Sequence, residues 1–179
     1  MASGSLLTKI HKGYQELVKL GLAPESKAAI HGAQTTGCSP ISVAQKAGLD
    51  FFKLVKPNTI AKSLTISTPT DGFYALKVMK ETAGAADDVT DEEIRDGIRW
   101  LAETEGIFAE TAGGVTVGAA RKLIAVGKIL VDDSAVFCII GNGLKTLDAV
   151  NGHVGKPREI KPSLREFEAM RSDEEKVSA

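Results

Sequence analysis

The sequence predicts an α/β fold, with a mostly parallel sheet flanked by helices, and three observations support it. Short apolar runs of strand length alternate with longer segments in which apolar residues recur every three or four positions. One run, 134–140 (SAVFCII), is almost continuously apolar, as in a strand buried on both faces of a parallel sheet. The chain has 179 residues and is 43% hydrophobic, which is enough for one core. We therefore expect one domain of alternating strands and helices.

The first predicted helix follows a short loop at the start of the sequence. Its apolar residues have helical spacing and predict one buried face: Leu6, Leu7, Ile10, Tyr14, Leu17 and Val18. Gly21, with Pro24 just beyond it, predicts where this helix ends. The next segment, 27–33 (KAAIHGA), is interpreted as a short strand.

Two more helices are predicted in the middle of the chain. In 38–48, Ser39 is the expected N-cap, Pro40 takes the first helical position and Gly48 ends the helix. The segment 68–84 (TPTDGFYALKVMKETAG) is the other helix.

Two further helices and the buried strand are predicted in the second half. The helix over 88–106 begins with a capping box formed by Thr90 and Glu93. A helix rich in glycine and alanine follows over 111–127, ahead of the strand at 134–140. The acidic residues of 87–93 are interpreted as a solvated helix start, where carboxylates complement the helix dipole.

The chain becomes polar after about residue 151. We expect the sheet and its helices in residues 1–150, and a polar C-terminal tail in 151–179. Within the tail, 160–170 (IKPSLREFEAM) is expected to form a short helix docked on the body, and the last residues to be disordered.

Composition argues against several classes of protein. The 22 basic and 23 acidic residues nearly cancel and form no basic cluster, so no nucleic-acid partner is expected. The apolar run 135–140 is far shorter than the ~20 residues that span a bilayer, so no membrane is expected. Basic residues interrupt the first apolar stretch, unlike in a signal peptide. Neither Cys38, Cys138 nor the three histidines have metal-ligand spacing, so we expect no metal and a reducing, cytoplasmic location.

Three segments are candidates for a binding site. The segment 2–8 (ASGSLLT) places small residues at a helix start, where free N–H groups and the helix dipole favour an anion; a plain N-cap is the alternative. The segment 139–150 (IIGNGLKTLDAV) follows a predicted strand, at the sheet edge where α/β proteins bind ligands; a simple turn is the alternative. The segment 31–41 (HGAQTTGCSPI) is a second junction with small polar residues, in which Cys38 is interpreted as a buried hydrophobe.

Four stretches give the chain a resemblance to the threonine synthase family, whose members are pyridoxal-phosphate enzymes of the tryptophan-synthase β-like fold. They follow one another in the family's order: ASGSLLTKIHKGYQEL (2–17), IHGAQTTGCSPI (30–41) with KPNTIAKSL (56–64), EEIRDGIRWLAETEGIFAETAGGVTV (92–117) and GNGLKTLDAV (141–150). The resemblance extends to about residue 168. It implies that residues 1–150 are the C-terminal portion of a pyridoxal-phosphate-dependent catalytic domain.

The resemblance also implies site residues. The cofactor phosphate would be held by the loop Ala2, Ser3, Gly4, Ser5 and Leu6, and the pyridine ring would lie beside Ile140 and Gly141. Substrate contacts would come from Gln34, Thr35, Thr36 and Ser39.

Two departures from the family pattern bear on activity. Ile140 stands where the family usually has a threonine whose hydroxyl meets the ring nitrogen. The family's Schiff-base lysine, in an SFKDR-like motif, and its ring-binding asparagine both precede the phosphate loop, and neither motif occurs here. We therefore expect no catalytic residue in this chain, which would be a truncated or split product that starts inside a longer sequence.

By resemblance, the parent enzyme converts O-phospho-L-homoserine and water to L-threonine and phosphate. The chain alone would be inactive without an N-terminal half, and it would form homo-oligomers or self-associate. One alternative is a related pyridoxal-phosphate lyase such as threonine dehydratase, or the related cysteine synthase. Another is a non-catalytic fragment that acts only as a pairing or phosphate-binding module.

Overall fold

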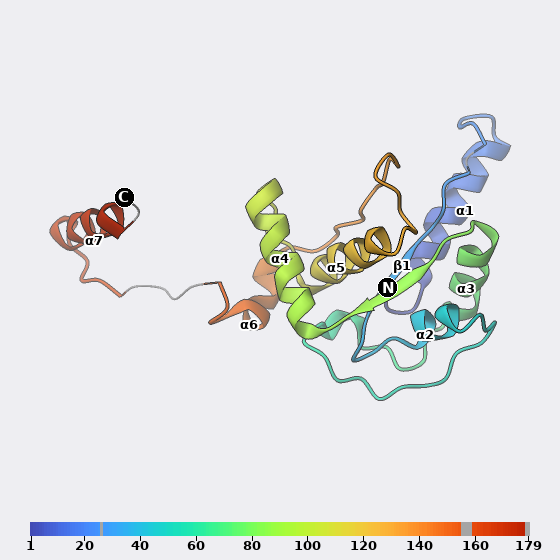
Figure 1. Ribbon diagram of the computed structural model, residues 1–179, viewed down its shortest axis with the longest axis horizontal. Coiled ribbons are helices and arrows are strands. Elements are labelled where there is room, and N and C mark those ends of the chain that lie inside the picture. Colours follow the sequence, from blue (N-terminus) through green and yellow to red (C-terminus); the bar gives the residue numbers. More distant parts are fainter. Residues whose placement is uncertain (26, 155–158, 178–179) are drawn as a thin grey trace.

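A computed structural model describes residues 1–25, 27–154 and 159–177, and it shows a small parallel sheet flanked by helices (Figure 1). The α/β class expected from the sequence is confirmed. In chain order the elements are α1 (Ser5–Lys19), β1 (Gly32–Thr35), α2 (Pro40–Lys46), the 3-10 helix η1 (Lys62–Leu64), α3 (Gly72–Glu81), β2 (Ala86–Val89), α4 (Asp91–Glu105), α5 (Thr111–Ala125), the 3-10 helix η2 (Gly143–Thr146), α6 (Leu147–Val150) and α7 (Leu164–Val177).

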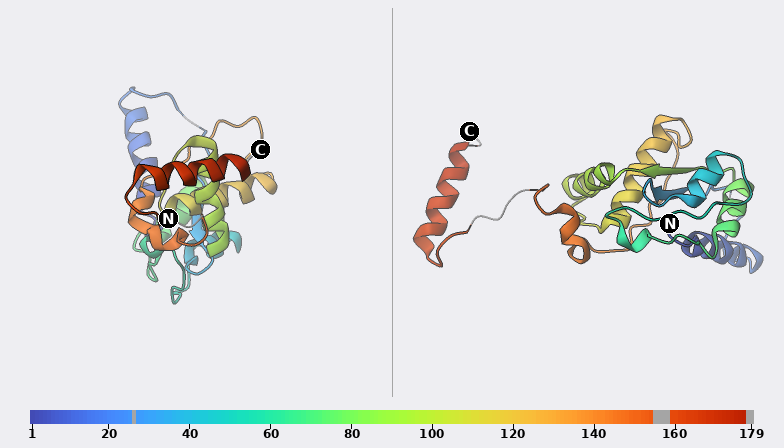
Figure 2. Two further views of the ribbon diagram at one scale, coloured as in Figure 1. Left: turned by 90° about the vertical axis from the view of Figure 1, so that its left-hand side faces the viewer. Right: turned by 90° about the horizontal axis from the view of Figure 1, so that it is seen from below.

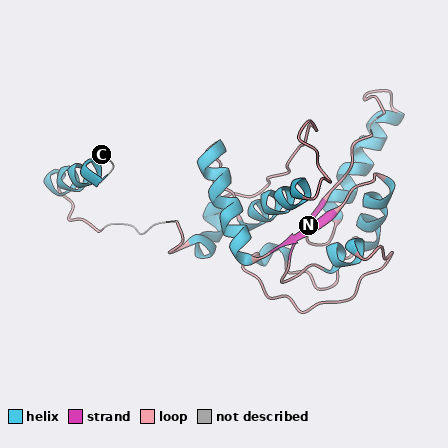
Figure 3. Ribbon diagram, viewed as in Figure 1, coloured by secondary structure: helices cyan, strands magenta, loops and turns pink. Residues whose placement is uncertain are grey.

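The two strands lie side by side at the centre of the body (Figure 3). They pair in parallel, with Gly32 opposite Ala86 and Thr35 opposite Val89. Helix α5 packs on the strands from one side, and α2 with α3 lies on the other (Figure 1). Because strand residues alternate between faces, Ala86 joins the apolar cluster of α1, α2 and α3, and Val89 joins that of α4 and α5.

The predicted helix boundaries are confirmed where the sequence carried capping signals. Pro40 is the first residue of α2, and Gly48 follows the helix in the left-handed conformation, with a φ of 69°. At the start of α4, Thr90 Oγ1 accepts the N–H of Glu93 at 3.2 Å, and the Glu93 carboxylate accepts the N–H of Thr90 at 2.7 Å. This capping box satisfies two N–H groups at the helix start.

Both strands differ from the sequence interpretation. Strand β1 covers Gly32–Thr35, whereas a strand over 27–33 was expected. Strand β2 was missed, since Asp87 and Asp88 were interpreted as part of a solvated helix start. A strand with two adjacent carboxylates forms here because Lys46 pairs with both of them, with Asp87 at 2.6 Å.

The apolar run 134–140 is not a strand, so this prediction was wrong. Among the described residues the sheet has two strands, and neither pairs with this segment. Val136 is 89% exposed and Ile140 is 70% exposed. A strand buried on both faces needs neighbouring backbone and a cover on each face, and the described chain supplies neither here.

Helix α1 forms as predicted, but its apolar face is not buried. Leu7 is buried, whereas Leu6, Ile10 and Leu17 are exposed by 49%, 47% and 44%. Figure 2 shows α1 at the margin of the body, with one side against the remaining elements. The periodicity therefore predicted the helix correctly and its burial incorrectly.

Two facing glycines allow α4 and α5 to pack closely. A Cβ at Gly97 would lie 2.5 Å from the carbonyl oxygen of Gly114, beside the fully buried Val115. We expect Gly97→Ala to destabilise the fold by about 2–3 kcal/mol, because the helices would have to separate. The matched substitution Gly13→Ala in α1, where the new Cβ would meet no atom of another element within 4 Å, should instead stabilise the fold by about 0.5–1 kcal/mol. Urea unfolding measures both, and effects of equal sign would contradict the packing argument.

His31 forms a pH-dependent hydrogen bond at the start of the sheet. Its Nδ1 accepts the N–H of Ala85 at 3.1 Å, which only a neutral acceptor nitrogen can do. Burial lowers the pKa of His31 below 6.5, although the carboxylate of Asp133 opposes this shift. The neutral ring thus contributes stability that is complete above pH 6.5 and is lost as the pH falls through the lowered pKa.

We expect acidification through this range to cost the wild-type chain about 1 kcal/mol more than a His31→Asn variant, because Asn keeps an acceptor but does not titrate. Burial also lowers the pKa of the Met1 ammonium to about 6, so the comparison between the two proteins is needed to isolate His31. Urea unfolding at several pH values is the measurement. Parallel pH profiles for the two proteins would contradict the assignment.

The segment 151–179 contains α7, which stands apart from the body in Figures 1 and 2. Docking of this helix stays a prediction, and the last two residues lie outside the described ones. In the part of the chain that is described, no helix has the length and apolarity to cross a membrane.

Candidate functional site

The N-terminal loop lies across strand β1 and joins two of the candidate segments. The Met1 ammonium donates to the carbonyl oxygen of Ala33, and Gln34 Nε2 donates to the Met1 carbonyl at 3.3 Å. Ala2 packs against the apolar cluster of α4 and α5. The predicted phosphate loop and the predicted substrate segment are therefore neighbours at the sheet.

The start of α1 has the geometry of an anion cradle. Gly4 has a φ of 91°, which turns the chain sharply into the helix. Within the described residues, the N–H groups of Gly4, Leu6 and Leu7 have no hydrogen-bond acceptor, while that of Ser5 reaches the Ser3 hydroxyl at 3.3 Å. Unpaired N–H groups at a helix start favour an anionic ligand.

Asp71, which the sequence reasoning missed, supports this loop from the start of α3. Its N–H donates to the Ser3 carbonyl at 3.0 Å, and its carboxylate accepts the hydroxyl of Ser5. A Cβ at Gly4 would lie 3.0 Å from both the Asp71 carbonyl oxygen and the Ala75 Cβ. The only sequence signal was an aspartate before a glycine at a helix start, which is too common to indicate a site.

The predicted substrate residues divide into two kinds. Gln34 and Thr35 are almost fully buried and make internal contacts: Gln34 Oε1 accepts the N–H of Ser42 at 2.8 Å, and Thr35 Oγ1 lies 2.9 Å from Thr59 Oγ1. Thr36 is exposed, and its hydroxyl donates to the Val89 carbonyl at 3.3 Å. Ser39 is the N-cap of α2, but its side chain makes no capping hydrogen bond.

The predicted pyridine-ring segment sits at the start of α5. The Gly141 carbonyl accepts the N–H of Glu110 at 3.0 Å, and the N–H of Gly143 donates to the Phe108 carbonyl at 2.9 Å. The Glu110 side chain covers Gly141 so closely that a Cβ there would collide with it. Phe108 and Ala2 pack against the same cluster, which relates this segment to the N-terminal loop.

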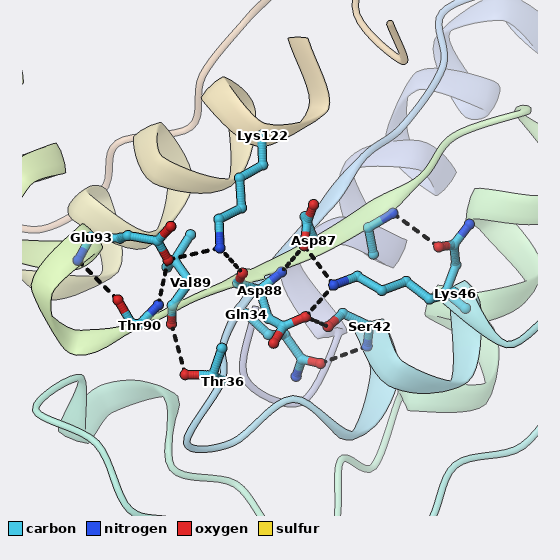
Figure 4. A network of polar contacts seen from close by, with 12 residues as sticks. Gln34, Thr36, Ser42, Lys46, Asp87, Asp88, Val89, Thr90, Glu93 and Lys122 are labelled. Atoms are coloured by element: carbon cyan, nitrogen blue, oxygen red, sulfur yellow. Dashed lines mark hydrogen bonds and ion pairs between the residues drawn. The ribbon is translucent and has the colours of Figure 1, made fainter. Parts of the chain in front are cut away.

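A polar network holds the elements around these loops in place (Figure 4). Lys46 of α2 pairs with Asp87 and Asp88 of β2; although burial opposes it, these carboxylates raise the pKa of Lys46. Lys122 of α5 donates to the Asp88 carbonyl at 2.9 Å and to the Glu93 carboxylate at 2.7 Å. The ion pair lowers the pKa of Glu93, again against burial. The residue spacing gave no signal for this network.

Other candidate residues are accounted for by local structure. Cys38 is buried and its Sγ lies 3.5 Å from the Ile66 carbonyl oxygen; burial raises the pKa of this thiol, which does not favour a nucleophile. No group of three potential metal ligands lies together in the described ranges.

The residues present fit one end of pyridoxal phosphate. The unpaired N–H groups of Gly4, Leu6 and Leu7 suit the phosphate. At the predicted pyridine position, the Ile140 side chain has no hydrogen-bonding group for a ring nitrogen.

Comparisons with known proteins bear on the family of the chain. The profile of the family described as pyridoxal-phosphate dependent enzyme matches residues 1–141. A threonine synthase of Methanosarcina acetivorans is 36% identical over 140 residues, which are 78% of this chain and 34% of that protein. A threonine synthase of Methanocaldococcus jannaschii is 35% identical over 144 residues, or 80% of this chain and 35% of that protein.

Among solved structures, a maize serine racemase is similar with a TM-score of 0.57 and 17% sequence identity, over 97% of this chain and 45% of that chain. This likeness shows the fold. The chain spans about a third of the length of the first two curated relatives.

Proposed function

The chain belongs to the family of pyridoxal-phosphate dependent enzymes, and on this premise we propose that it is the phosphate-binding part of a threonine synthase. The whole enzyme would convert O-phospho-L-homoserine and water to L-threonine and phosphate. The relatives' names support this reaction. The main structural support for a phosphate site is the set of unpaired N–H groups at Gly4, Leu6 and Leu7.

In this proposal the N-terminal loop holds the cofactor by its phosphate. The N–H groups of Gly4, Leu6 and Leu7 and the hydroxyls of Ser3 and Ser5 would donate to the phosphate oxygens, with the positive end of the α1 dipole behind them. Pyridoxal phosphate, when bound, supplies an electron sink for the reaction. The chain's own task is thus to bind the cofactor and fix its orientation.

Around the loop, the remaining site residues would contact the substrate and the pyridine ring. Thr36 is the candidate for direct substrate contact, since it is exposed at the end of β1, whereas Ser39 at the start of α2 is buried. Gln34 and Thr35 would hold that turn from inside the protein. Ile140 and Gly141 would contact the pyridine ring without a hydrogen bond to its nitrogen.

The Schiff-base lysine would come from a part of the enzyme that precedes this sequence in its relatives. Ile140 and the absence of an SFKDR-like motif favour one alternative, a non-catalytic module that only pairs or binds phosphate. The two proposals share the phosphate cradle and differ in whether a partner with the lysine restores turnover of O-phospho-L-homoserine.

Titration of the isotope-labelled chain with inorganic phosphate tests the shared cradle. We expect saturable NMR shifts of the amides of residues 3–7, larger than those elsewhere, because these N–H groups are open. The first turn of α4 is an internal control, since the N–H of Glu93 is occupied by Thr90. If the α4 amides shift as much as those of residues 3–7, or if residues 3–7 do not shift, the cradle assignment is wrong.

A further inference from the structure

We infer that Asp71 is a positioning residue of the phosphate cradle, and that its carboxylate takes the place of an anion there and so weakens the binding of a phosphate group. This inference rests on the proposed function of the loop. It starts from three contacts that Asp71 makes with consecutive loop residues.

The backbone of Asp71 fixes the shape of the loop. Its N–H holds the Ser3 carbonyl at 3.0 Å, and its own carbonyl oxygen closes the space beside the Gly4 Cα. Glycine has no Cβ to fill that space, and for the same reason it readily adopts the φ of 91° found at Gly4.

The side chain of Asp71 places a carboxylate beside the same loop. Its carboxylate accepts the Ser5 hydroxyl at the start of α1, where the helix dipole favours a negative charge. In the part of the chain that the structure describes, no lysine, arginine or histidine forms an ion pair with Asp71. The carboxylate therefore lies beside the cradle without a described basic partner.

A phosphate group entering the cradle meets this charge. It competes with the Asp71 carboxylate for the hydrogen bond that the Ser5 hydroxyl donates. It also brings a second negative charge close to that of the carboxylate. Like charges a few ångström apart repel even in water. Asp71 thus shapes the loop through its backbone and limits its affinity for phosphate through its carboxylate.

The test compares the wild-type chain with its D71N and D71S variants, using inorganic phosphate as the probe and the amide shifts of residues 3–7 as the readout. Both substitutions remove the carboxylate charge. Asparagine and serine are both good N-cap residues for α3, so we expect at least one of the two variants to fold. We expect phosphate to bind about fivefold more tightly to either variant, the effect of removing one nearby unit charge in largely solvated surroundings. The control D96N removes an exposed carboxylate on α4 and should leave the affinity unchanged.

The outcomes separate this inference from the proposed function. Wild-type binding with no gain in D71N and D71S would overturn the role of the carboxylate and leave the cradle intact. A gain of the same size in D96N would also overturn it, since the effect would then be one of net charge. Absence of saturable shifts in wild type and variants alike would overturn the cradle itself.

Discussion

Pyridoxal phosphate mixed with the purified chain is expected to produce no saturable visible absorbance band, and no single lysine should become labelled after borohydride reduction. A lysine must be neutral to attack the cofactor aldehyde. Beside the sheet, Asp87 and Asp88 raise the pKa of Lys46 and so favour its cationic form. The other lysine there, Lys122, donates hydrogen bonds to the Asp88 carbonyl at 2.9 Å and to the Glu93 carboxylate at 2.7 Å. No lysine in the chain lies in an SFKDR-like motif.

The experiment has a positive arm and a control. Co-expression with a polypeptide that carries the SFKDR-like lysine motif and the preceding half of the relatives' fold should produce the band and the label on that partner's lysine. The same partner with its lysine changed to alanine is the control. A saturable band from the chain alone, lost when Lys46 or Lys122 is changed to methionine, would contradict this prediction. It would show that the Schiff-base lysine lies in this chain and not in the N-terminal half.

The isolated chain is also expected to be marginally stable, to self-associate and to bind a hydrophobic dye. On α1, Ile10 and Leu17 are 47% and 44% exposed, and in the 134–140 segment Val136 and Phe137 are 89% and 46% exposed. Each Å² of apolar surface left in water forgoes roughly 25 cal/mol, so a few hundred Å² would offset much of a typical stability of about 5–15 kcal/mol. Large exposed apolar surface promotes association.

Substitutions on α1 make this prediction specific. The double variant I10S/L17S should bind clearly less dye and sediment as smaller species. The matched variant K9S/K19S, on exposed positions of the same helix, should behave as wild type. Co-expression with the N-terminal half should lower dye binding and sharpen the thermal transition. Cooperative thermal unfolding of a monomer that does not bind the dye would contradict the prediction. It would mean that the chain buries its own hydrophobic core without a partner.

The sequence alone determined the features that depend on neighbouring residues. The capping box of Thr90 and Glu93, the proline at the first position of α2 and the left-handed glycine after it are local interactions, and they appear as predicted. The ordered motifs also indicated the cofactor family correctly, because phosphate-binding loops are local structures with a characteristic composition. The roles of the individual site residues stay predictions.

Tertiary structure decided what depends on distant partners. Asp87 and Asp88 lie in a strand where both contact Lys46, which is far away in the sequence, and the strand-like run 134–140 pairs with neither strand of the described sheet. Asp71 belongs to the candidate site only because α3 brings it to the start of α1. Periodicity records which face of a segment is apolar, but not whether another element covers that face. The sequence therefore determined the helices, their caps and the family, whereas the strands, the exposed face of α1 and the charge beside the phosphate loop depend on contacts between remote segments.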